Sequence, residues 1–458
     1  MAHTRPATAG TWPGVAVRAQ VPGVARTRVG AIGGRRCVVV TVDPSQRRGA
    51  LSSTASDTLA DAARLALAER LPLVGILGSS GADIVEGVAA LHAWGRAARA
   101  VAGCSGTVPV LFAIVGPAVS GTALLLGLAD HVVMTSDAYA FVSGPTMVAE
   151  FTGVLIDSTE LGGADVHARS SGVADLVVPD EAAALEALEL LLAHLPDHAD
   201  EEPARRPADD PPGRPTPALR DVIPSAATGS YDIRSVMREL VDDGELVELR
   251  SRWATNLVTA YGAIGGRPVG LVGNQPLALA GTLDIPASQK GARFVSACDT
   301  FNLPLVTLVD TPGFYPGKDL EWRGMIRHGA QLVFAYGRAT VPRVCVILRK
   351  SYGGAYIVMD SKRMGNDVCL AWPGAELAVM GAKGAVEILH RRASAEERAE
   401  REREYEERLL NPYLAAERGY VDAVIDPAET RAAVHEALAA LDAKRETIVG
   451  RKHDNMPL

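Results

Sequence analysis

The chain has 458 residues, of which 48% are hydrophobic and 22% are charged, and its net charge is −8. This length suffices for roughly two to four average domains, and the composition excludes a largely disordered protein. Because the 46 basic and 54 acidic residues are not concentrated in a stripe of one sign, the sequence argues against a non-specific nucleic-acid binder.

The first third of the chain alternates predicted strands and helices. Residues 37–42 and 71–77 are short apolar runs typical of buried strands, and residues 59–70 between them have the 3.6-residue spacing of an amphipathic helix. Helical spacing resumes over residues 84–101, and residues 108–115 form a further apolar strand before a glycine turn and another helix. This order predicts an α/β fold with parallel sheets covered by helices.

Two later segments differ from this pattern in composition. Residues 196–224 contain eight prolines among many charges, which predicts an extended and poorly packed linker. Residues 391–408 are dominated by Arg and Glu four positions apart, which predicts a solvated or subunit-crossing helix. We therefore expect a first domain over residues 1–195, a linker, and a second domain over residues 225–458.

Short motifs of the first half recur in the second half. The sequence GAIGGR of residues 30–35 returns 232 positions later at residues 262–267, and LPLV of residues 71–74 returns with the same shift at residues 303–306. A third match follows 233 positions after residues 107–109. Their shared order and near-constant shift predict an internal duplication and two tandem domains of one fold.

The cysteines and the hydropathy pattern bear on the compartment. The five cysteines stand singly, without a CxxC pair, which predicts reduced, buried thiols. No apolar run approaches the ~18 residues of a membrane span, and residues 1–20 lack the apolar core of a signal peptide. We therefore expect a cytoplasmic protein with no membrane partner.

Each copy carries a glycine turn between a strand and a helix, at Val119-Ser120-Gly121 and at Tyr352-Gly353-Gly354-Ala355. One such turn usually has only a structural reason, but a pair at equivalent positions favours a function. Amides in the first turn of a helix have no intrahelical acceptor, so each turn can hold a developing oxyanion, and one such donor is typically worth ~2.7–4 kcal/mol. The loops at residues 79–82 and 311–314 can supply further amides. Two oxyanion holes suggest two reactants whose carbonyl oxygens both gain charge.

Competing motifs are incomplete. Residues 310–313 have the DxxG form of a GTPase segment, yet the chain has no GxxxxGK[ST] loop. His194 and His198 have metal-ligand spacing, but Pro196 lies between them. Ser120 is not part of a GxSxG elbow, and no nucleophile with an evident histidine base stands out. The chemistry is therefore expected to depend on backbone amides, without a metal.

Several segments of the second copy have distinctive sequences: GNQP at 273–276, GTLDI at 281–285, VDTPGF at 309–314, RKSYGGAY at 349–356, NPY at 411–413 and the ending KHDNMPL at 452–458. They resemble the motifs of the carboxyltransferase (β) subunit of biotin-dependent acyl-CoA carboxylases, of the propionyl-CoA carboxylase type. The first copy matches less closely, at residues 81–87, 144–145 and 160–163.

This resemblance implies two tandem crotonase-like domains of the ClpP/crotonase ββα-superhelix type. It also implies a ring-like homohexamer, a dimer of trimers, with active sites between the first domain of one subunit and the second domain of another. The reaction moves CO2 from N1-carboxybiotin to the α-carbon of an acyl-CoA thioester through an enolate. The enolate oxygen and the ureido oxygen of biotin both gain charge, which gives a reason for two holes. The base would be the decarboxylated biotin itself.

The resemblance also assigns residues to the two holes. Ser120 and Gly121 would stabilise the thioester oxygen, and Gly354 and Ala355 would stabilise the ureido oxygen of biotin. The acyl-CoA site would further include Ser79, Ser80, Gly81, Ala82, Gly116, Pro117, Gly144 and Ile357. The biotin site would further include Gly313, Phe314, Gly353 and Tyr356. Ile357 would line an acyl pocket with room for several short acyl chains.

Departures from the family pattern gather in the first copy. Residues 46–50, Gln-Arg-Arg-Gly-Ala, replace a Gly-rich stretch, Asp83 replaces a basic residue, and Ser120 replaces one glycine of a pair. Only about 29 residues precede this copy, where relatives have an extra helical region. We therefore expect an intact biotin site and an unusual acyl substrate, either a specialised acyl-CoA or a carrier-protein thioester.

The expected partners follow from what the sequence contains. It has no biotin-accepting Met-Lys-Met turn and no ATP-binding carboxylase domain, so a separate biotin carboxylase and biotin carrier subunit would supply carboxybiotin. Two alternatives remain open. The chain could be a biotin-independent crotonase-type thioester decarboxylase, or a non-catalytic partner of a full-length homologue in a mixed ring.

Overall fold

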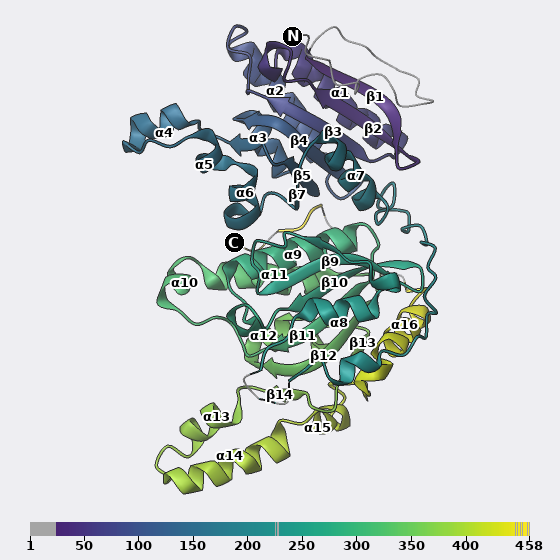
Figure 1. The fold of residues 1–458 in the computed structure, drawn as a ribbon, viewed down its shortest axis with the longest axis vertical. Coiled ribbons are helices and arrows are strands. Elements are labelled where there is room, and N and C mark those ends of the chain that lie inside the picture. The colour runs from purple at the N-terminus through teal and green to yellow at the C-terminus, as the bar shows by residue number, and fades with distance from the viewer. Residues whose placement is uncertain are drawn as a thin grey trace. The chain divides into compact units, whose positions relative to one another are not determined.

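The computed structural model describes residues 24–458 except residues 225, 227, 228, 445, 447, 449, 451, 456 and 458. The chain divides into two compact units, Met1–Glu202 and Pro203–Leu458 (Figure 1). The expected shortened start before Val24, the expected first residue of the second domain, Ser225, and two residues of the family-like ending, Met456 and Leu458, lie outside the described residues.

The first unit alternates strands and helices as the sequence predicts. Its elements are β1 (Ala25–Ile32), β2 (Arg35–Val42), η1 (Arg47–Gly49), α1 (Ser53–Glu69), β3 (Leu73–Ser79), α2 (Val88–Ala102), β4 (Val110–Val119), α3 (Gly121–Leu126), β5 (His131–Thr135), β6 (Tyr139–Phe141), α4 (Pro145–Thr152), α5 (Ser158–Gly162), α6 (Ala164–Val166), η2 (His167–Ser171), β7 (Leu176–Val178) and α7 (Glu181–Leu192).

The sheet of the first unit has the order β1-β2-β3-β4-β5-β7, with β6 beside β4. β1 and β2 are antiparallel, and the pairs from β2 onward are parallel. Val38, Val40 and Val42 alternate along β2 and pack with the alanines of α1 in one core, while α7 contacts β4, β5 and β7. Helices cover the sheet as the strand–helix–strand order predicts (Figure 1).

The second unit repeats this series. Its elements are η3 (Pro217–Arg220), α8 (Ile233–Leu240), η4 (Asp242–Gly244), β8 (Val247–Leu249), β9 (Leu257–Ile264), β10 (Arg267–Asn274), η5 (Leu279–Gly281), α9 (Ile285–Thr300), β11 (Leu305–Thr311), α10 (Lys318–Trp322), α11 (Met325–Arg338), β12 (Arg343–Tyr352), α12 (Gly353–Val358), η6 (Lys362–Met364), β13 (Val368–Ala371), β14 (Glu376–Ala378), α13 (Ala382–Leu389), α14 (Ala395–Leu409), α15 (Pro412–Glu417), β15 (Ala423–Val424), η7 (Pro427–Glu429) and α16 (Thr430–Ala440).

The second sheet has the order β8-β9-β10-β11-β12-β13-β15, with β14 beside β12. Apart from the added β8, this is the order of the first sheet, so the predicted duplication of an α/β fold is confirmed. The backbone repeats in detail. Arg47 and Arg48 are left-handed (φ 48° and 55°), and so are Leu279 and Ala280, 232 positions later (φ 48° and 53°).

Two predicted helices have different starts. The helix expected from residue 59 begins at Ser53, because the hydroxyl of Ser52 accepts a hydrogen bond from the amide of Ala55 and caps it. The helix expected from residue 84 begins only at Val88. The carboxylate and carbonyl of Asp83 accept the amides of Val85 and Glu86, which forms a turn in place of the first helical residues.

Residues 200–215 of the proline-rich segment are exposed or half-buried, while its two ends are hydrogen-bonded within the two units. In the first unit, the amide of Ala199 donates to the carbonyl of Thr107 (2.9 Å). In the second unit, the buried Thr216 donates to the carbonyl of Ala428 (2.8 Å), and Leu219 belongs to the core. The high proline content predicts the extended backbone of this segment, but it does not predict the hydrogen bonds that the other residues make.

The charged segment after residue 391 forms α14, whose side chains are exposed or half-buried, as predicted for a solvated helix. In Figure 1, α13 and α14 extend from their sheet as an arm. The five cysteines are free and buried, as predicted. Within the described residues, each helix is too short or too polar to span a bilayer.

Candidate active site

The first predicted hole is the turn from β4 to α3. Ser120 caps α3 with φ 58° and ψ −117°, a backbone conformation that a residue with a side chain rarely adopts. Its amide donates to the carbonyl of Phe141 in β6 (2.9 Å). The amide of Ser120 is thus committed to the sheet. Of the two predicted donors, Gly121 is the one whose amide remains at the helix start without an intrahelical acceptor.

Gly121 lies close to an aromatic side chain that the sequence did not single out. A Cβ added to Gly121 would lie 2.4 Å from Nε1 of Trp94, which comes from α2. A side chain at this position would therefore displace the indole ring. Trp94 belongs to the amphipathic pattern of its helix, so periodicity predicts its partial burial but not its contact with the turn.

The loop at residues 79–82 lies next to this turn. A Cβ added to Gly81, whose φ is 99°, would lie 3.5 Å from the Cβ of Ser120. The amide of Gly81 donates to the hydroxyl of Ser79 (3.1 Å), which leaves the amide of Ala82 as the further candidate donor. The amide of Ser80 donates to the carbonyl of Arg48 (3.0 Å), which ties the loop to the neighbouring η1 segment.

Two residues of the first copy that were expected to depart from the family pattern, Arg47 and Asp83, form an ion pair. The guanidinium of Arg47 lies 2.5 Å from the carboxylate of Asp83, which is buried. Arg47 is largely exposed, so it covers the acidic residue and neutralises its charge. Arg47 and Asp83, two of the residues expected to depart from the family pattern, are thus in contact beside the loop at residues 79–82. Sequence spacing alone does not reveal this pairing.

Three further residues predicted for the acyl site, Gly116, Pro117 and Gly144, lie around β4 and β6. Gly116 and Pro117 belong to the last part of β4, and Pro117 pairs with Tyr139 of β6. Gly144 caps α4, and a Cβ on it would lie 3.4 Å from the ring of Phe141. These residues therefore gather at the end of the first sheet that carries the turn.

The second predicted hole is the turn from β12 to α12. Gly353 has φ 61°, and a Cβ on it would lie 3.1 Å from the carbonyl of Val379. A Cβ on Gly354 would meet the ring of Phe314 at 3.6 Å, so the predicted biotin residues Gly354 and Phe314 are neighbours. The loop that contains Phe314 is fixed by Leu283, whose amide donates to the carbonyl of Gly313 (3.1 Å).

Asp310 stabilises the strands beneath this turn. Its carboxylate accepts hydrogen bonds from Nε of Arg349 (3.0 Å) and from the amide of Lys350 (3.1 Å), so it joins the end of β11 to β12. Burial raises the pKa of Asp310, although Arg349 acts in the opposite direction. The residue that the sequence placed in an incomplete GTPase motif is therefore part of the framework of the second turn.

Tyr352 and Glu376 join the second turn to β14. The hydroxyl of Tyr352 donates to the carboxylate of Glu376, and a Cβ on Gly381 would lie 3.5 Å from the ring of Tyr352. Burial, followed by the hydrogen bond to Glu376, raises the pKa of Tyr352. β14 also leads to Val379, whose carbonyl faces Gly353, so this contact fixes the strand behind the hole.

α12 carries Ala355 and Tyr356, which were predicted for the biotin side, and Ile357, which was predicted for the acyl site. Ala355 is buried, and Ile357 is 43% exposed, which leaves its side chain accessible to a substrate. Tyr356 is half-buried, and burial together with the nearby thiols of Cys369 and Cys345 raises its pKa. The phenol of Tyr356 thus lies near the two thiols of the sheet beneath α12.

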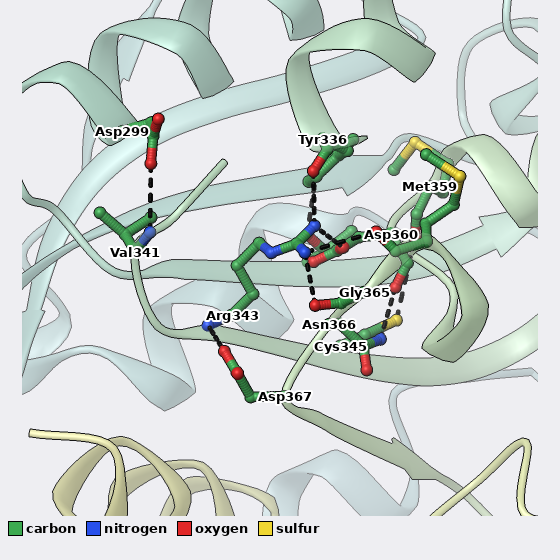
Figure 2. A network of polar contacts seen from close by, with 12 residues as sticks. Asp299, Tyr336, Val341, Arg343, Cys345, Met359, Asp360, Gly365, Asn366 and Asp367 are labelled. Atoms are coloured by element: carbon green, nitrogen blue, oxygen red, sulfur yellow. Dashed lines mark hydrogen bonds and ion pairs between the residues drawn. The ribbon is translucent and has the colours of Figure 1, made fainter. Parts of the chain in front are cut away.

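A buried polar network below α12 escaped sequence reasoning (Figure 2). The guanidinium of Arg343, at the start of β12, donates to the carboxylate of Asp360 (2.7 Å), which follows α12, and to the carbonyl of Tyr336 (2.8 Å). Both side chains of the ion pair are buried. Burial raises the pKa of Asp360 to about 7, although Arg343 acts in the opposite direction. This pair joins the start of the strand to the end of the helix that follows the turn.

The sequence predicts chemistry that does not involve a metal ion. Among the residues that the structure describes, no group of three or more His, Cys, Asp or Glu side chains is arranged to hold a metal ion. The chemistry that the two turns offer is the stabilisation of negative charge by backbone amides at helix starts.

Comparisons with known proteins identify the family of the chain. The family model described as carboxyl transferase domain matches residues 16–456. The chain is 43% identical to a propionyl-CoA carboxylase beta chain of Roseobacter denitrificans, over 94% of this chain and 85% of the relative. It is 42% identical to a biotin-dependent acetyl-/propionyl-coenzyme A carboxylase beta5 subunit of Mycobacterium tuberculosis, over 94% of this chain and 82% of that subunit.

A solved structure of the transcarboxylase 12S hexamer, with methylmalonyl-coenzyme A bound, superposes with a TM-score of 0.93 and 40% identity. The match covers 95% of this chain and 85% of the transcarboxylase chain. A single-chain, multi-domain long-chain acyl-CoA carboxylase matches with a TM-score of 0.78 and 29% identity, over 90% of this chain and 41% of that chain. With the duplicated fold and both turns in place, the chain belongs to the carboxyl transferase domain family.

Proposed function

We propose that the chain is the carboxyltransferase subunit of a biotin-dependent acyl-CoA carboxylase, which transfers CO2 from N1-carboxybiotin to the α-carbon of an acyl thioester. The observation that carries this proposal is the pair of strand-to-helix turns at equivalent places of the two units, with φ 58° at Ser120 and 61° at Gly353. The names of the relatives, which are biotin-dependent acyl-CoA carboxylase subunits, support it.

The first turn would act on the thioester. Loss of the α-proton converts the thioester to an enolate, whose oxygen becomes negatively charged and needs donors that are already oriented. The amide of Gly121 supplies one donor, and the amide of Ala82 in the adjacent loop supplies the other. The positive end of α3 adds to the potential at the same point. The α-carbon is then free to form its new bond to CO2.

The second turn would act on the biotin group. When bound, carboxybiotin supplies the CO2 and, after losing it, the basic nitrogen that takes up the α-proton. The amides of Gly354 and Ala355 would stabilise the charge on the ureido oxygen, and Phe314 would pack against the ring next to Gly354. Gly353 and Gly313 give the backbone the shape that lets these groups approach.

The acyl side would accept an unusual substrate, either a specialised acyl-CoA or a carrier-protein thioester. Ser120 adds a side chain where a glycine would leave space, and Arg47 and Asp83 form a neutral pair beside the loop at residues 79–82. Ile357 offers an apolar, 43% exposed side chain to the acyl group. These features support a change in thioester preference rather than a change in the biotin reaction.

The partners we propose are a separate biotin carboxylase and a biotin carrier subunit. We also propose a homohexamer, supported by the hexamer of the transcarboxylase 12S structure that this chain resembles. A cytoplasmic location is supported by the five free, buried thiols.

The test combines the purified chain with a biotin carboxylase, a biotinylated carrier, ATP, labelled bicarbonate and a panel of acyl thioesters. Label on a thioester, lost in Gly121→Val and in Gly354→Val variants that remain folded, supports the proposal. Loss of carboxylate from malonyl-type thioesters without biotin would instead identify a decarboxylase. Activity that requires an added full-length homologue would identify a non-catalytic partner.

A further inference from the structure

The first turn is hydrogen-bonded to a very short strand, β6. β6 has three residues and lies beside the end of β4, where Pro117 pairs with Tyr139 and Val119 pairs with Phe141. The carbonyl of Phe141 accepts the amide of Ser120 (2.9 Å). The position of the turn therefore depends on the position of β6. A strand this short needs support along its other edge, because a few hydrogen bonds on one side do not fix it.

Residues after α5 provide this support. The amide of Ala164 donates to the carbonyl of Ala138 (3.0 Å), and Gly163 forms a bridge with Tyr139. Nε2 of His167 lies 2.8 Å from the carbonyl oxygen of Ala140, the middle residue of β6. The packing is tight, since a Cβ on Gly162 would lie 2.1 Å from that carbonyl oxygen and 3.4 Å from Nε2 of His167.

The imidazole of His167 is fixed on both sides. A carbonyl oxygen only accepts, so Nε2 carries the proton and donates it to Ala140. Nδ1 lies 2.7 Å from the hydroxyl of Ser171 and accepts its hydrogen in the neutral ring. The wide π turn of η2 brings His167 and Ser171, four positions apart, to the same side. The ring can thus hold the carbonyl of Ala140 in one orientation.

The corresponding segment of the second unit, α15, contains no histidine among residues 412–417. The left-handed residues Gly172 and Gly419 end the two corresponding segments, with φ 67° and 70°. Counting back five positions from each glycine gives His167 in the first segment and Leu414 in the second. β14, the counterpart of β6, pairs with β12 and contacts α15, and its Glu376 accepts the hydroxyl of Tyr352 from β12. The histidine is therefore not a requirement of the fold but a feature of the first turn.

We infer that His167 is a positioning residue for the first oxyanion turn. Its Nε2–H holds Ala140, the next carbonyl along β6 holds the amide of Ser120, and the turn then directs the amide of Gly121 toward the thioester oxygen. The assignment of the thioester to this turn rests on the proposed function. The chain of contacts from His167 to Ser120 does not, and it can be tested in the absence of any substrate.

The experiment compares His167→Leu, His167→Gln and the control Arg169→Ala, an exposed residue of the same π turn. Hydrogen–deuterium exchange of a peptide spanning residues 117–124 reports the amide of Ser120 without substrate. We expect His167→Leu to raise its exchange rate about tenfold or more and to lower the kcat of carboxyl transfer about 10- to 100-fold, as for a displaced donor. The KM for free biotin should not change.

Glutamine can place its Nε2 where the imidazole Nε2 lies, so His167→Gln should retain the protected amide and most of the turnover, and Arg169→Ala should match the wild-type chain. Unchanged exchange at residues 117–124 in His167→Leu would overturn the inference, whatever the melting temperature does. A change of equal size in the KM for biotin would also overturn it. If the wild-type chain transfers no carboxyl group, the proposed function fails, and the exchange experiment still decides the role of His167.

Discussion

Ser120 and Gly353 occupy the same place in the two units and have nearly the same φ, 58° and 61°. Only the second is a glycine. A residue with a Cβ in this conformation is strained by about 1–3 kcal/mol, and such strain persists where the surrounding structure holds it. Here the hydrogen bond from the amide of Ser120 to Phe141 and the start of α3 hold it. The first turn thus stores strain that the second turn avoids.

The first prediction concerns Ser120→Gly. Glycine relieves the strain of the positive φ. It also gives the unfolded chain more conformational entropy, which lowers stability by roughly 0.5–1 kcal/mol, so we expect a net gain of about 1 kcal/mol in the free energy of unfolding. Urea unfolding followed by circular dichroism measures it. A variant less stable than the wild-type chain would show that the hydroxyl of Ser120 makes a stabilising contact that outweighs the strain.

The second prediction is the reverse change, Gly353→Ser. The new serine would have a positive φ, and its Cβ would lie 3.1 Å from the carbonyl of Val379. We therefore expect a loss of about 1–3 kcal/mol in the free energy of unfolding. The same urea experiment tests it, with Gly374→Ser, where a Cβ meets open space and φ is not positive, as the control. Equal stability of the two variants would contradict the strain argument.

The third prediction separates the two holes by their packing. A Cβ on Gly121 would lie 2.4 Å from the indole of Trp94, whereas a Cβ on Gly354 would make an ordinary contact of 3.6 Å with Phe314. We expect Gly121→Ala to cost about 1–3 kcal/mol of stability through overpacking, and Gly354→Ala to cost less than about 1 kcal/mol. Thermal unfolding of both variants is the measurement. In a Trp94→Ala background, this difference in stability loss between the two variants should disappear.

The sequence predicted the elements of this fold well because each depends on local pattern. The apolar runs around Val38 and Val74 are strands, and the repeated GAIGGR motif marks a turn that the duplication places in both units. The contacts that complete the site join distant residues. Arg47 pairs with Asp83, and Arg343 pairs with Asp360, across separations with no helical or strand period. No spacing rule indicates such pairs.

The fourth prediction concerns Tyr352→Phe. The change removes the hydroxyl that joins the second turn to Glu376 in β14. We expect kcat with free biotin to fall about tenfold, because a donor displaced by a fraction of an ångström loses much of its effect, while the KM for the thioester stays constant. Steady-state kinetics of both substrates measures it, and Tyr413→Phe, an exposed tyrosine, is the control. A higher KM for the thioester would place the second turn on the acyl side.

The fifth prediction concerns the pH dependence of stability at Asp360. Burial raises its pKa to about 7 from the ordinary value of 3.8, so between these pH values the folded state holds a proton that the unfolded chain has released. Its contribution to stability is therefore complete below about pH 4 and is lost as the pH rises toward 7. A shift of this size corresponds to a change on the order of 1–3 kcal/mol between pH 5 and pH 8.

Asparagine at this position does not titrate. We therefore expect the difference in the free energy of unfolding between the wild-type chain and Asp360→Asn to shrink as the pH rises from 5 to 8. Urea titrations at four pH values measure it, and Asp61→Asn, an exposed residue, should give a constant difference. A difference that stays constant from pH 5 to pH 8 would mean that Arg343, 2.7 Å away, keeps the carboxylate charged throughout, because a pKa below 3.8 confines the pH dependence to more acidic solutions.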